Sequence, residues 1–243
     1  MEHTFQGKTA LITGAGSGIG RAIALKFSGY GIRPLLVGRK KERLLETAEL
    51  IQKQGGEAFV FAGDITDTEF LRACVEEAIH RTGQLDVLVN NAGMALNCPF
   101  EKVTEKEYDA IFALNARAPF FLCQEALPWL RRSDCATILN IASVTGHKGY
   151  VQQSAYAASK HALVGFSKTL AAELYKENIR VHVISPGGVY TDMVAVARPD
   201  LSSEGMILAE DIADIAAFYL EHRFTNAVVD EICVHRVGKT PFL

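Results

Sequence analysis

The sequence predicts one α/β domain over residues 1–243, built on a doubly wound parallel sheet with helices on both faces. Three observations predict this fold. Short apolar runs alternate strictly with helical segments, which is the order of a parallel sheet with crossover helices. The runs are apolar almost throughout, as strands buried on both faces are. A glycine-rich turn joins the first run to the first helix, and no Pro/Ser-rich linker or repeat divides the chain.

Each element follows from its local pattern, in order along the chain. The opening "KTALITGAGSGIG" passes from an apolar run through glycines into a helix that ends near Gly31. Later helices carry apolar residues at helical spacing, and the next two end on Gly55 and Gly83. The further strands are expected at residues 32–38, 57–66, 85–93, 136–143, 179–186 and 227–237. The further helices are expected at residues 39–55, 67–83, 104–132, 153–176 and 209–223.

Composition narrows the classes of function. The net charge is 25 − 28 = −3, so no general attraction to nucleic acid or to an anionic membrane is expected. No apolar run is long enough to span a membrane and the N-terminus lacks a secretion signal, so we expect a cytoplasmic protein. The five cysteines are scattered without a CxxC pair, and the seven histidines show no metal-binding spacing. Neither a disulfide framework nor a metal site is therefore predicted.

The glycine-rich turn "TGAGSGIG" lies between the first strand and the first helix. Glycine lets the backbone approach a phosphate closely, and a helix N-terminus offers N–H groups and a positive dipole end. No lysine follows, so the turn is not the nucleotide-binding GxxxxGK(S/T) motif. We predict that it binds the diphosphate of a dinucleotide, the alternative being a merely flexible turn. The candidate residues are Gly14, Gly16, Ser17, Gly18, Ile19 and Gly20.

The end of the second strand predicts which dinucleotide binds. An acidic residue there would hold the ribose 2′-hydroxyl of NAD(H), but this chain has Gly38 followed by Arg39. A guanidinium at this place can pair with the 2′-phosphate of NADP(H). The sequence therefore favours NADP(H), with NAD(H) as the alternative. The competing interpretation is that the basic residues here are only the solvated start of a helix.

Five motifs then occur together in one order along the chain: "TGAGSGIG", "NNAG" at 90–93, Ser143, "YAASK" at 156–160 and "PGG" at 186–188. With this set, the chain resembles the short-chain dehydrogenase/reductase family over essentially its full length. The resemblance implies a single Rossmann-type domain that binds a nicotinamide dinucleotide and interconverts a carbonyl and an alcohol. It implies a small-molecule carbonyl or alcohol substrate, and a homodimer or homotetramer that packs through the helices beginning near Thr104 and Gln153.

The catalytic candidates are Asn115, Ser143, Tyr156 and Lys160. Reducing a carbonyl needs a hydride on carbon and a proton on oxygen, and a tyrosine of pKa about 10 releases its proton poorly at neutral pH. Lys160 lies one helical turn from Tyr156, so its ammonium, together with the positive charge of the oxidised nicotinamide, is expected to lower the pKa of that tyrosine. Ser143 would hydrogen-bond the substrate oxygen. The resemblance implies that Lys160 binds the nicotinamide ribose, and that Asn115 lies at an interruption of its helix and holds a water. Pro119 cannot donate a hydrogen bond to the Asn115 carbonyl, which fits a break in the helix at that place.

The resemblance also implies cofactor contacts in three further segments. Asp64, with Ile65 beside it, matches the position that meets the adenine ring. Further contacts fall on Asn91, Ala92 and Gly93, which also support the sheet, and on Pro186, Gly187, Val189 and Thr191 near the nicotinamide and diphosphate.

Some features depart from the family pattern. Ser17 stands where NADP enzymes often carry a basic residue, the substrate segment over 192–208 is short, and the chain ends without paired glycines. That ending resembles the sepiapterin reductase-like subgroup, whereas the core motifs resemble 3-oxoacyl-carrier-protein reductases. Weaker candidates to border the substrate are His147, Tyr150, Met94 and Cys98.

The leading hypothesis is an NADP(H)-dependent reductase of a small ketone or a 3-oxoacyl group. The alternatives are an NAD-dependent alcohol dehydrogenase of the same fold, a non-catalytic NADP(H)-binding regulatory protein, and a sugar-nucleotide epimerase. The intact catalytic set argues against the regulatory protein, and the chain lacks the additional C-terminal region that an epimerase normally needs.

Overall fold

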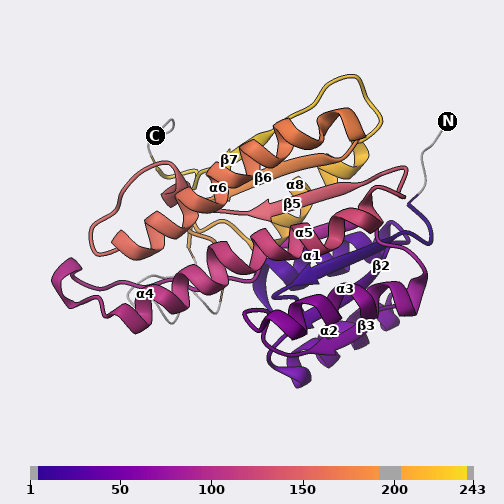
Figure 1. The fold of residues 1–243 in the computed structure, drawn as a ribbon, viewed down its shortest axis with the longest axis horizontal. Coiled ribbons are helices and arrows are strands. Elements are labelled where there is room, and N and C mark those ends of the chain that lie inside the picture. Colours follow the sequence, from indigo (N-terminus) through magenta and orange to yellow (C-terminus); the bar gives the residue numbers. More distant parts are fainter. Residues whose placement is uncertain (1–4, 192–203, 240–243) are drawn as a thin grey trace.

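The computed structural model describes residues 5–191 and 204–239, and its strands form one parallel sheet of seven strands in the order β3-β2-β1-β4-β5-β6-β7 (Figure 1). The strands are β1 (Thr9–Thr13), β2 (Arg33–Gly38), β3 (Phe59–Ala62), β4 (Val87–Asn90), β5 (Thr137–Ile141), β6 (Arg180–Pro186) and β7 (Glu231–Val234). The order reverses direction between β1 and β4, which opens a crevice at the carboxyl ends of these strands. The expected doubly wound parallel sheet is confirmed.

The helices follow the strands in the expected order. They are α1 (Gly18–Gly29), α2 (Lys41–Lys53), α3 (Thr68–Thr82), α4 (Glu105–Phe112), α5 (Ala118–Leu130), α6 (Ser154–Leu174) and α8 (Ala209–Glu221). The segment expected as one helix over 104–132 is divided by a π-helical turn, η2 (Ala113–Arg117). The last strand is shorter than expected because the ladder with β6 pairs only four of its residues, from Glu231 to Val234.

Two apolar cores cover the two faces of the sheet. Residues of α1, α2 and α8 form one core, with Phe27 and Ile12 among its fully buried side chains. Residues of α3, α5 and α6 form the other, around Leu11 and Leu88. Burial on both faces explains the unbroken apolar strands. No helix in the part of the chain that the structure describes is long and apolar enough to cross a membrane.

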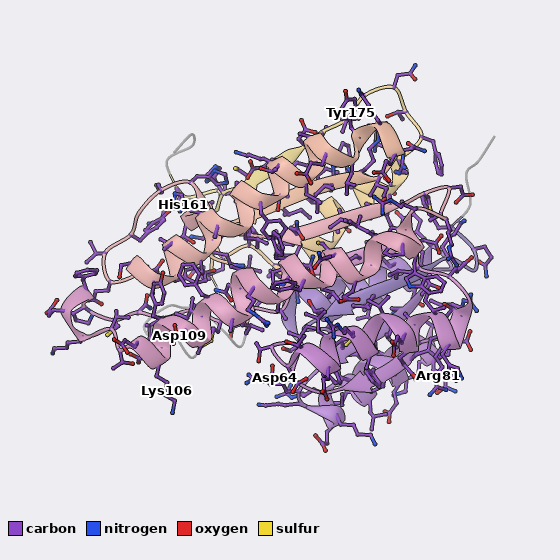
Figure 2. All side chains as sticks on the ribbon, viewed as in Figure 1. Asp64, Arg81, Lys106, Asp109, His161 and Tyr175 are labelled. Atoms are coloured by element: carbon purple, nitrogen blue, oxygen red, sulfur yellow. The ribbon has the colours of Figure 1, made fainter. Side chains whose placement is uncertain are left out.

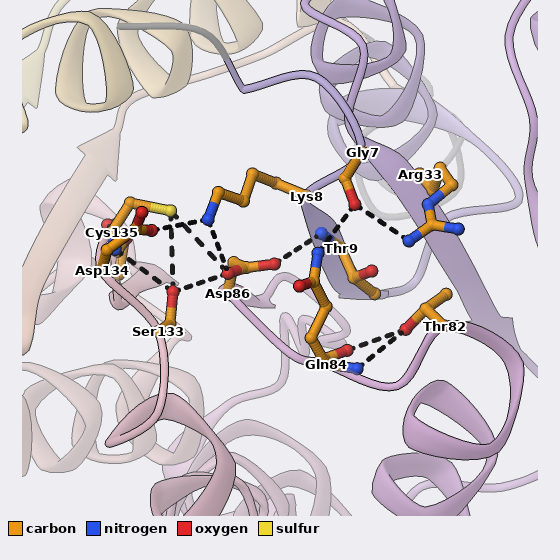
Figure 3. A network of polar contacts seen from close by, with 11 residues as sticks. Gly7, Lys8, Thr9, Arg33, Thr82, Gln84, Asp86, Ser133, Asp134 and Cys135 are labelled. Atoms are coloured by element: carbon orange, nitrogen blue, oxygen red, sulfur yellow. Dashed lines mark hydrogen bonds and ion pairs between the residues drawn. The ribbon is translucent and has the colours of Figure 1, made fainter.

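A polar network closes the amino-terminal end of the sheet (Figure 3). The buried Asp86 accepts hydrogen bonds from the Thr9 backbone at 2.8 Å and from the Ser133 hydroxyl at 2.6 Å, while Lys8 pairs with Asp134 at 2.6 Å. In Figure 2, Asp64 and Arg81 mark the two ends of the layer that contains α3. Asp64 follows β3 and lies at the carboxyl end of the sheet, where the candidate site is found.

Candidate active site

One cavity of about 1240 Å³ runs along the carboxyl ends of the strands. Almost all the residues singled out in the sequence line it, although they come from seven separate segments of the chain. Those lining it are Gly14, Gly16, Ser17, Gly18, Ile19, Arg39, Asp64, Ile65, Asn91, Ala92, Gly93, Ser143, Tyr156, Lys160, Pro186, Gly187, Val189 and Thr191. Gly20 and Asn115 are not part of its wall.

The glycine turn is packed so tightly that side chains are excluded from it. Gly14 has a positive φ of 68°, and a Cβ there would lie 2.7 Å from Asn91 Nδ2. A Cβ on Gly20 would overlap the Gly14 carbonyl oxygen, so this glycine lets α1 approach β1 from behind the cavity wall. Ser17 is the N-cap of α1, and its side chain accepts no capping hydrogen bond from the described residues. The first turn of α1 carries no acidic residue either, which leaves its positive dipole end for an external anion.

The "NNAG" segment ties the centre of the sheet to this turn. The Asn91 side chain donates to the Thr13 carbonyl at 2.9 Å, and the backbone N–H groups of Asn91 and Ala92 both donate to Thr13 Oγ1 at 3.0 Å. One strand further, Asn90 donates to Asn140 Oδ1 at 2.8 Å inside the sheet. These bonds join the end of β1 to the end of β4 at the point where the strand order reverses.

The end of the cavity beside the turn after β2 is basic. Arg39, Lys40 and Arg43 line it, and among the described lining residues only Asp64 is acidic. The backbone and hydroxyl of Thr66 donate to the Asp64 carboxylate at 2.9 and 2.8 Å. These bonds, together with the charge of Arg39, lower the pKa of Asp64 against the opposing effect of burial. The carboxylate therefore stays ionised and fixed in the turn after β3.

Ser143, Tyr156 and Lys160 meet at another part of the same cavity wall. Burial raises the pKa of Tyr156, while hydrogen bonding with Ser143 and Thr145 opposes this rise. Lys160 Nζ lies 6.0 Å from the centre of the Tyr156 ring and donates to the Ile141 carbonyl at 2.8 Å. The protein groups alone thus shift the Tyr156 pKa upward, because desolvation outweighs the hydrogen bonds. The expected lowering, which also includes the charge of an oxidised nicotinamide, stays a prediction.

Burial also acts on the lysine. Lys160 is only 5% exposed, and desolvation lowers its pKa to about 8. Its ammonium form therefore still predominates at neutral pH, which preserves a positive charge beside Tyr156.

Asn115 lies behind the cavity within the π-helical turn, so the expected interruption of its helix is present. Its Oδ1 accepts from the Met94 N–H at 2.9 Å, and its Nδ2 donates to the Met94 carbonyl at 2.9 Å and to Ser159 Oγ at 3.0 Å. The side chain thereby fastens the loop after β4 to α6, next to Lys160.

The turn after β6 completes the wall. Gly187 N donates to the Val234 carbonyl at 2.8 Å, and Val189 pairs with Ile207 in an isolated bridge. Thr191 lies against the glycine turn, since its Cγ2 would be 3.0 Å from a Cβ on Gly18. The short substrate segment expected over 192–208 falls mostly on residues 192–203, which lie outside the described residues.

Comparison with known proteins fits this geometry. The family model for short chain dehydrogenases matches residues 8–202. A 3-oxoacyl-(acyl-carrier-protein) reductase of Staphylococcus aureus (strain Mu50) is 33% identical over 199 residues, which cover 81% of this chain and 80% of the relative. This chain belongs to the short-chain dehydrogenase/reductase family. It is accordingly an oxidoreductase with an NAD(P)-binding Rossmann fold.

Two further similarities concern members of the family with different names. The hydroxynaphthalene reductase-like protein Arp2 of Metarhizium brunneum is 39% identical over 193 residues, covering 79% of this chain and 72% of that protein. The solved structure of a metagenomic short-chain oxidoreductase in complex with NADP superposes with a TM-score of 0.83 at 31% identity, covering 96% of this chain and 98% of that one.

The residues present fit the dinucleotide that the family uses. The cavity is larger than the roughly 300–1,000 Å³ of ordinary small-molecule pockets. The glycine turn forms part of its wall, and the N-terminus of α1 opens onto it. Gly14 packs against Asn91 and Ala92 without a side chain, so the backbone of this turn borders the cavity directly. Residues of the glycine turn would hold the diphosphate, and Lys160 the nicotinamide ribose.

The four weaker candidates to border the substrate lie in different places. Met94 lines the cavity, as expected. Cys98 and Tyr150 are not among the lining residues, and the His147 side chain is directed toward Glu231. The motifs did not point to Thr145 or to the Ile141 carbonyl, which act on Tyr156 and Lys160. A threonine two residues after Ser143 is a weak signal, and a backbone acceptor leaves none in the sequence.

Proposed function

We propose that the protein is an NADP(H)-dependent carbonyl reductase that converts a small ketone or a 3-oxoacyl group to an alcohol, reversibly. One observation carries the proposal: Ser143, Tyr156 and Lys160 share a cavity wall whose far end is a glycine turn with basic residues beside it. The constellation offers a donor to the carbonyl oxygen, a proton source and a cation within one site.

Bound NADPH would supply the hydride. Ser143 would donate its hydroxyl hydrogen to the substrate oxygen and stabilise the negative charge that develops there. Tyr156 would deliver the proton, and its raised pKa keeps the phenol protonated at neutral pH, which is the form that reduction needs. Lys160, held by the Ile141 carbonyl, would keep a positive charge beside the phenolate after the transfer.

The preference for NADP(H) rests on charge. Three basic side chains line the adenosine end, and Asp64, the one acidic residue among the described lining residues, is fixed by Thr66 in the turn after β3. A 2′-phosphate needs cationic partners, whereas an NAD-specific site needs a carboxylate at the end of β2, where this chain has Gly38 and Arg39. A relative of known structure holds NADP.

The test is the substitution Tyr156→Phe, which removes the hydroxyl and keeps the ring. With a panel of ketones and 3-oxoacyl thioesters, we expect NADPH oxidation to fall at least a hundredfold, whereas the fluorescence-measured affinity for NADPH changes less than threefold. Reduction of a carbonyl at the wild-type rate by Tyr156→Phe would refute the assignment of the proton donor. NADPH binding by the wild type without turnover of any panel member would favour a regulatory protein instead.

A further inference from the structure

Glu231, the first residue of the edge strand β7, joins three elements of the site. Its Oε1 lies 2.6 Å from His147 Nε2 and accepts a hydrogen bond from the Ser185 hydroxyl at 2.8 Å. Its Oε2 lies 3.7 Å from Lys168 Nζ. One carboxylate thus contacts side chains from the loop after β5, from β6 and from α6.

Each of these three elements carries or adjoins a residue proposed to act in catalysis or to bind the cofactor. His147 ends the short helix η3 (Val144–Gly146), whose N-cap is Ser143. Ser185 directly precedes the turn of Pro186 and Gly187, and Lys168 belongs to α6, the helix of Tyr156 and Lys160. The relative placement of these elements sets the distances among the groups that would act on the substrate.

The contacts form a closed network with defined donors. The Ser185 hydroxyl donates to Glu231, so its oxygen remains free to accept from His147 Nε2, which lies 3.1 Å away. The histidine nitrogen that faces both oxygens therefore carries the proton. Ser185 is fully buried, and the side chains of His147 and Glu231 are only 27% and 19% exposed, so water screens these bonds less than at an open surface.

The sheet register holds the carboxylate in place. Val183 of β6 is paired with Glu231, and Ser185 is paired with Cys233, so Glu231 and Ser185 share one face of the sheet. That face packs against α6, which explains how Lys168 reaches the same carboxylate.

We propose that Glu231 is a positioning residue for the reductase. It holds the loop after β5, which contains Ser143, through His147, and it holds the Pro186–Gly187 turn through Ser185. The inference rests on the proposed function of the site, although Glu231 itself does not line the cavity. A displacement of about 1 Å in a catalytic group can lower the reaction rate by up to a hundredfold. Loosening this network is therefore expected to lower turnover more than it weakens cofactor binding.

A metal site is the competing interpretation of the same cluster, since ligand atoms of His147, Glu231 and Cys233 lie within 4.8 Å of one another. The carboxylate oxygen that a cation would use is already engaged by Ser185 and His147. The ammonium of Lys168 would also repel a cation. The hydrogen-bonded network accounts for His147 and Glu231, and the Cys233 thiol lies 4.0 Å from the same carboxylate oxygen, so we favour positioning.

The experiment compares Glu231→Ala, Glu231→Gln and His147→Ala with the wild type, using whichever carbonyl the wild type reduces fastest. We expect Glu231→Ala to lower kcat by roughly ten- to a hundredfold, while the dissociation constant of NADPH stays within twofold. Glu231→Gln should recover most of the rate, because its amide oxygen still accepts from Ser185 and His147. Combining His147→Ala with Glu231→Ala should cost no more than the larger single effect, since both break one contact.

The matched control is Glu177→Gln, which removes an exposed ion pair with Arg131 far from the site and should leave kcat unchanged. The inference is overturned if Glu231→Ala turns over at the wild-type rate. It is equally overturned if NADPH affinity falls in step with kcat, or if the two alanine effects multiply, since these mark a general loss of structure. If Glu231→Ala does not fold, His147→Ala is judged by the same criteria, and a Glu231→Gln variant that loses as much rate as His147→Ala would also overturn the inference. Absence of wild-type turnover would instead count against the proposed function.

Discussion

Lys160 is a cation held inside the protein by one backbone acceptor. Only 5% of the residue is exposed, and desolvation lowers its pKa from 10.5 to about 8. Below pH 8 the folded protein must keep this buried ammonium, whereas between about pH 8 and 10.5 the unfolded chain binds more protons than the folded one. The free energy of unfolding that depends on Lys160 therefore rises with pH across that window.

We predict that Lys160→Met stabilises the protein at pH 7 and abolishes reduction. A shift from 10.5 to about 8 corresponds to about 3 kcal/mol, of which the lost hydrogen bond to Ile141 offsets about 1, so the gain is about 2 kcal/mol. Urea unfolding at pH 7 and 9.5 measures it, and the gain should shrink at the higher pH. The exposed control Lys41→Met should show no such dependence, and a destabilised Lys160→Met at pH 7 would contradict the argument.

Arg39 is the residue that should select the dinucleotide. We predict that Arg39→Gln weakens NADPH binding about tenfold and changes the affinity for NADH less than twofold. Only NADPH carries a 2′-phosphate, which loses its cationic partner in this variant. Fluorescence titration with both nucleotides measures the two affinities. Lys41→Gln, at a basic position outside the cavity wall, serves as the control. Equal weakening of NADPH and NADH binding would show that Arg39 contacts the adenine or supports the local structure, and does not select the 2′-phosphate.

The elements were largely predictable from the sequence, and the contacts between them were not. Strand and helix alternation follows from local apolar patterning, and the break near Asn115 follows from Pro119. The residues that gather at the cavity follow from ordered motifs. The upward shift of the Tyr156 pKa could not be predicted from a motif, because it depends on how deeply the folded chain buries the phenol. The turn of His147 toward Glu231 depends on a strand 84 residues later, which no local pattern encodes.

The π-helical turn η2 joins α4 and α5 and carries the buried side chain of Asn115. Both backbone groups of Met94 are satisfied by Asn115, so this single residue fixes a loop that lines the cavity. We predict that Asn115→Ala lowers the free energy of unfolding by about 2 kcal/mol, since Met94 loses both partners. It should also weaken NADPH binding several-fold.

Urea unfolding and NADPH titration measure these two effects together. Gln54→Ala, which removes an exposed amide beyond the end of α2, should change neither. Wild-type stability in Asn115→Ala would show that the amide is not needed to hold the loop.

At the scale of the whole molecule, aromatic side chains gather on the outer side of α4, α5 and α6. Tyr108, Phe120 and Phe121 are 45%, 49% and 37% exposed, and the Phe120 ring lies 5.6 Å from that of Phe166 on α6. Aromatic groups in water are unfavourable and are enriched in protein interfaces. The expected homodimer or homotetramer remains a proposal, and this face is the place for its contact.

The proposal predicts that Phe120→Glu shifts the protein toward the monomer. A carboxylate at the centre of an apolar contact must be desolvated without a partner, which costs several kcal/mol and raises the dimer dissociation constant at least a hundredfold. Sedimentation velocity over a range of concentrations measures the shift. Leu50→Glu on α2, at a residue of 38% exposure on the other side of the sheet, places the same charge outside the contact and should leave the assembly intact. A wild type that sediments as a monomer would show that these aromatic residues serve another purpose, whereas a dimer insensitive to Phe120→Glu would move the interface to a different face.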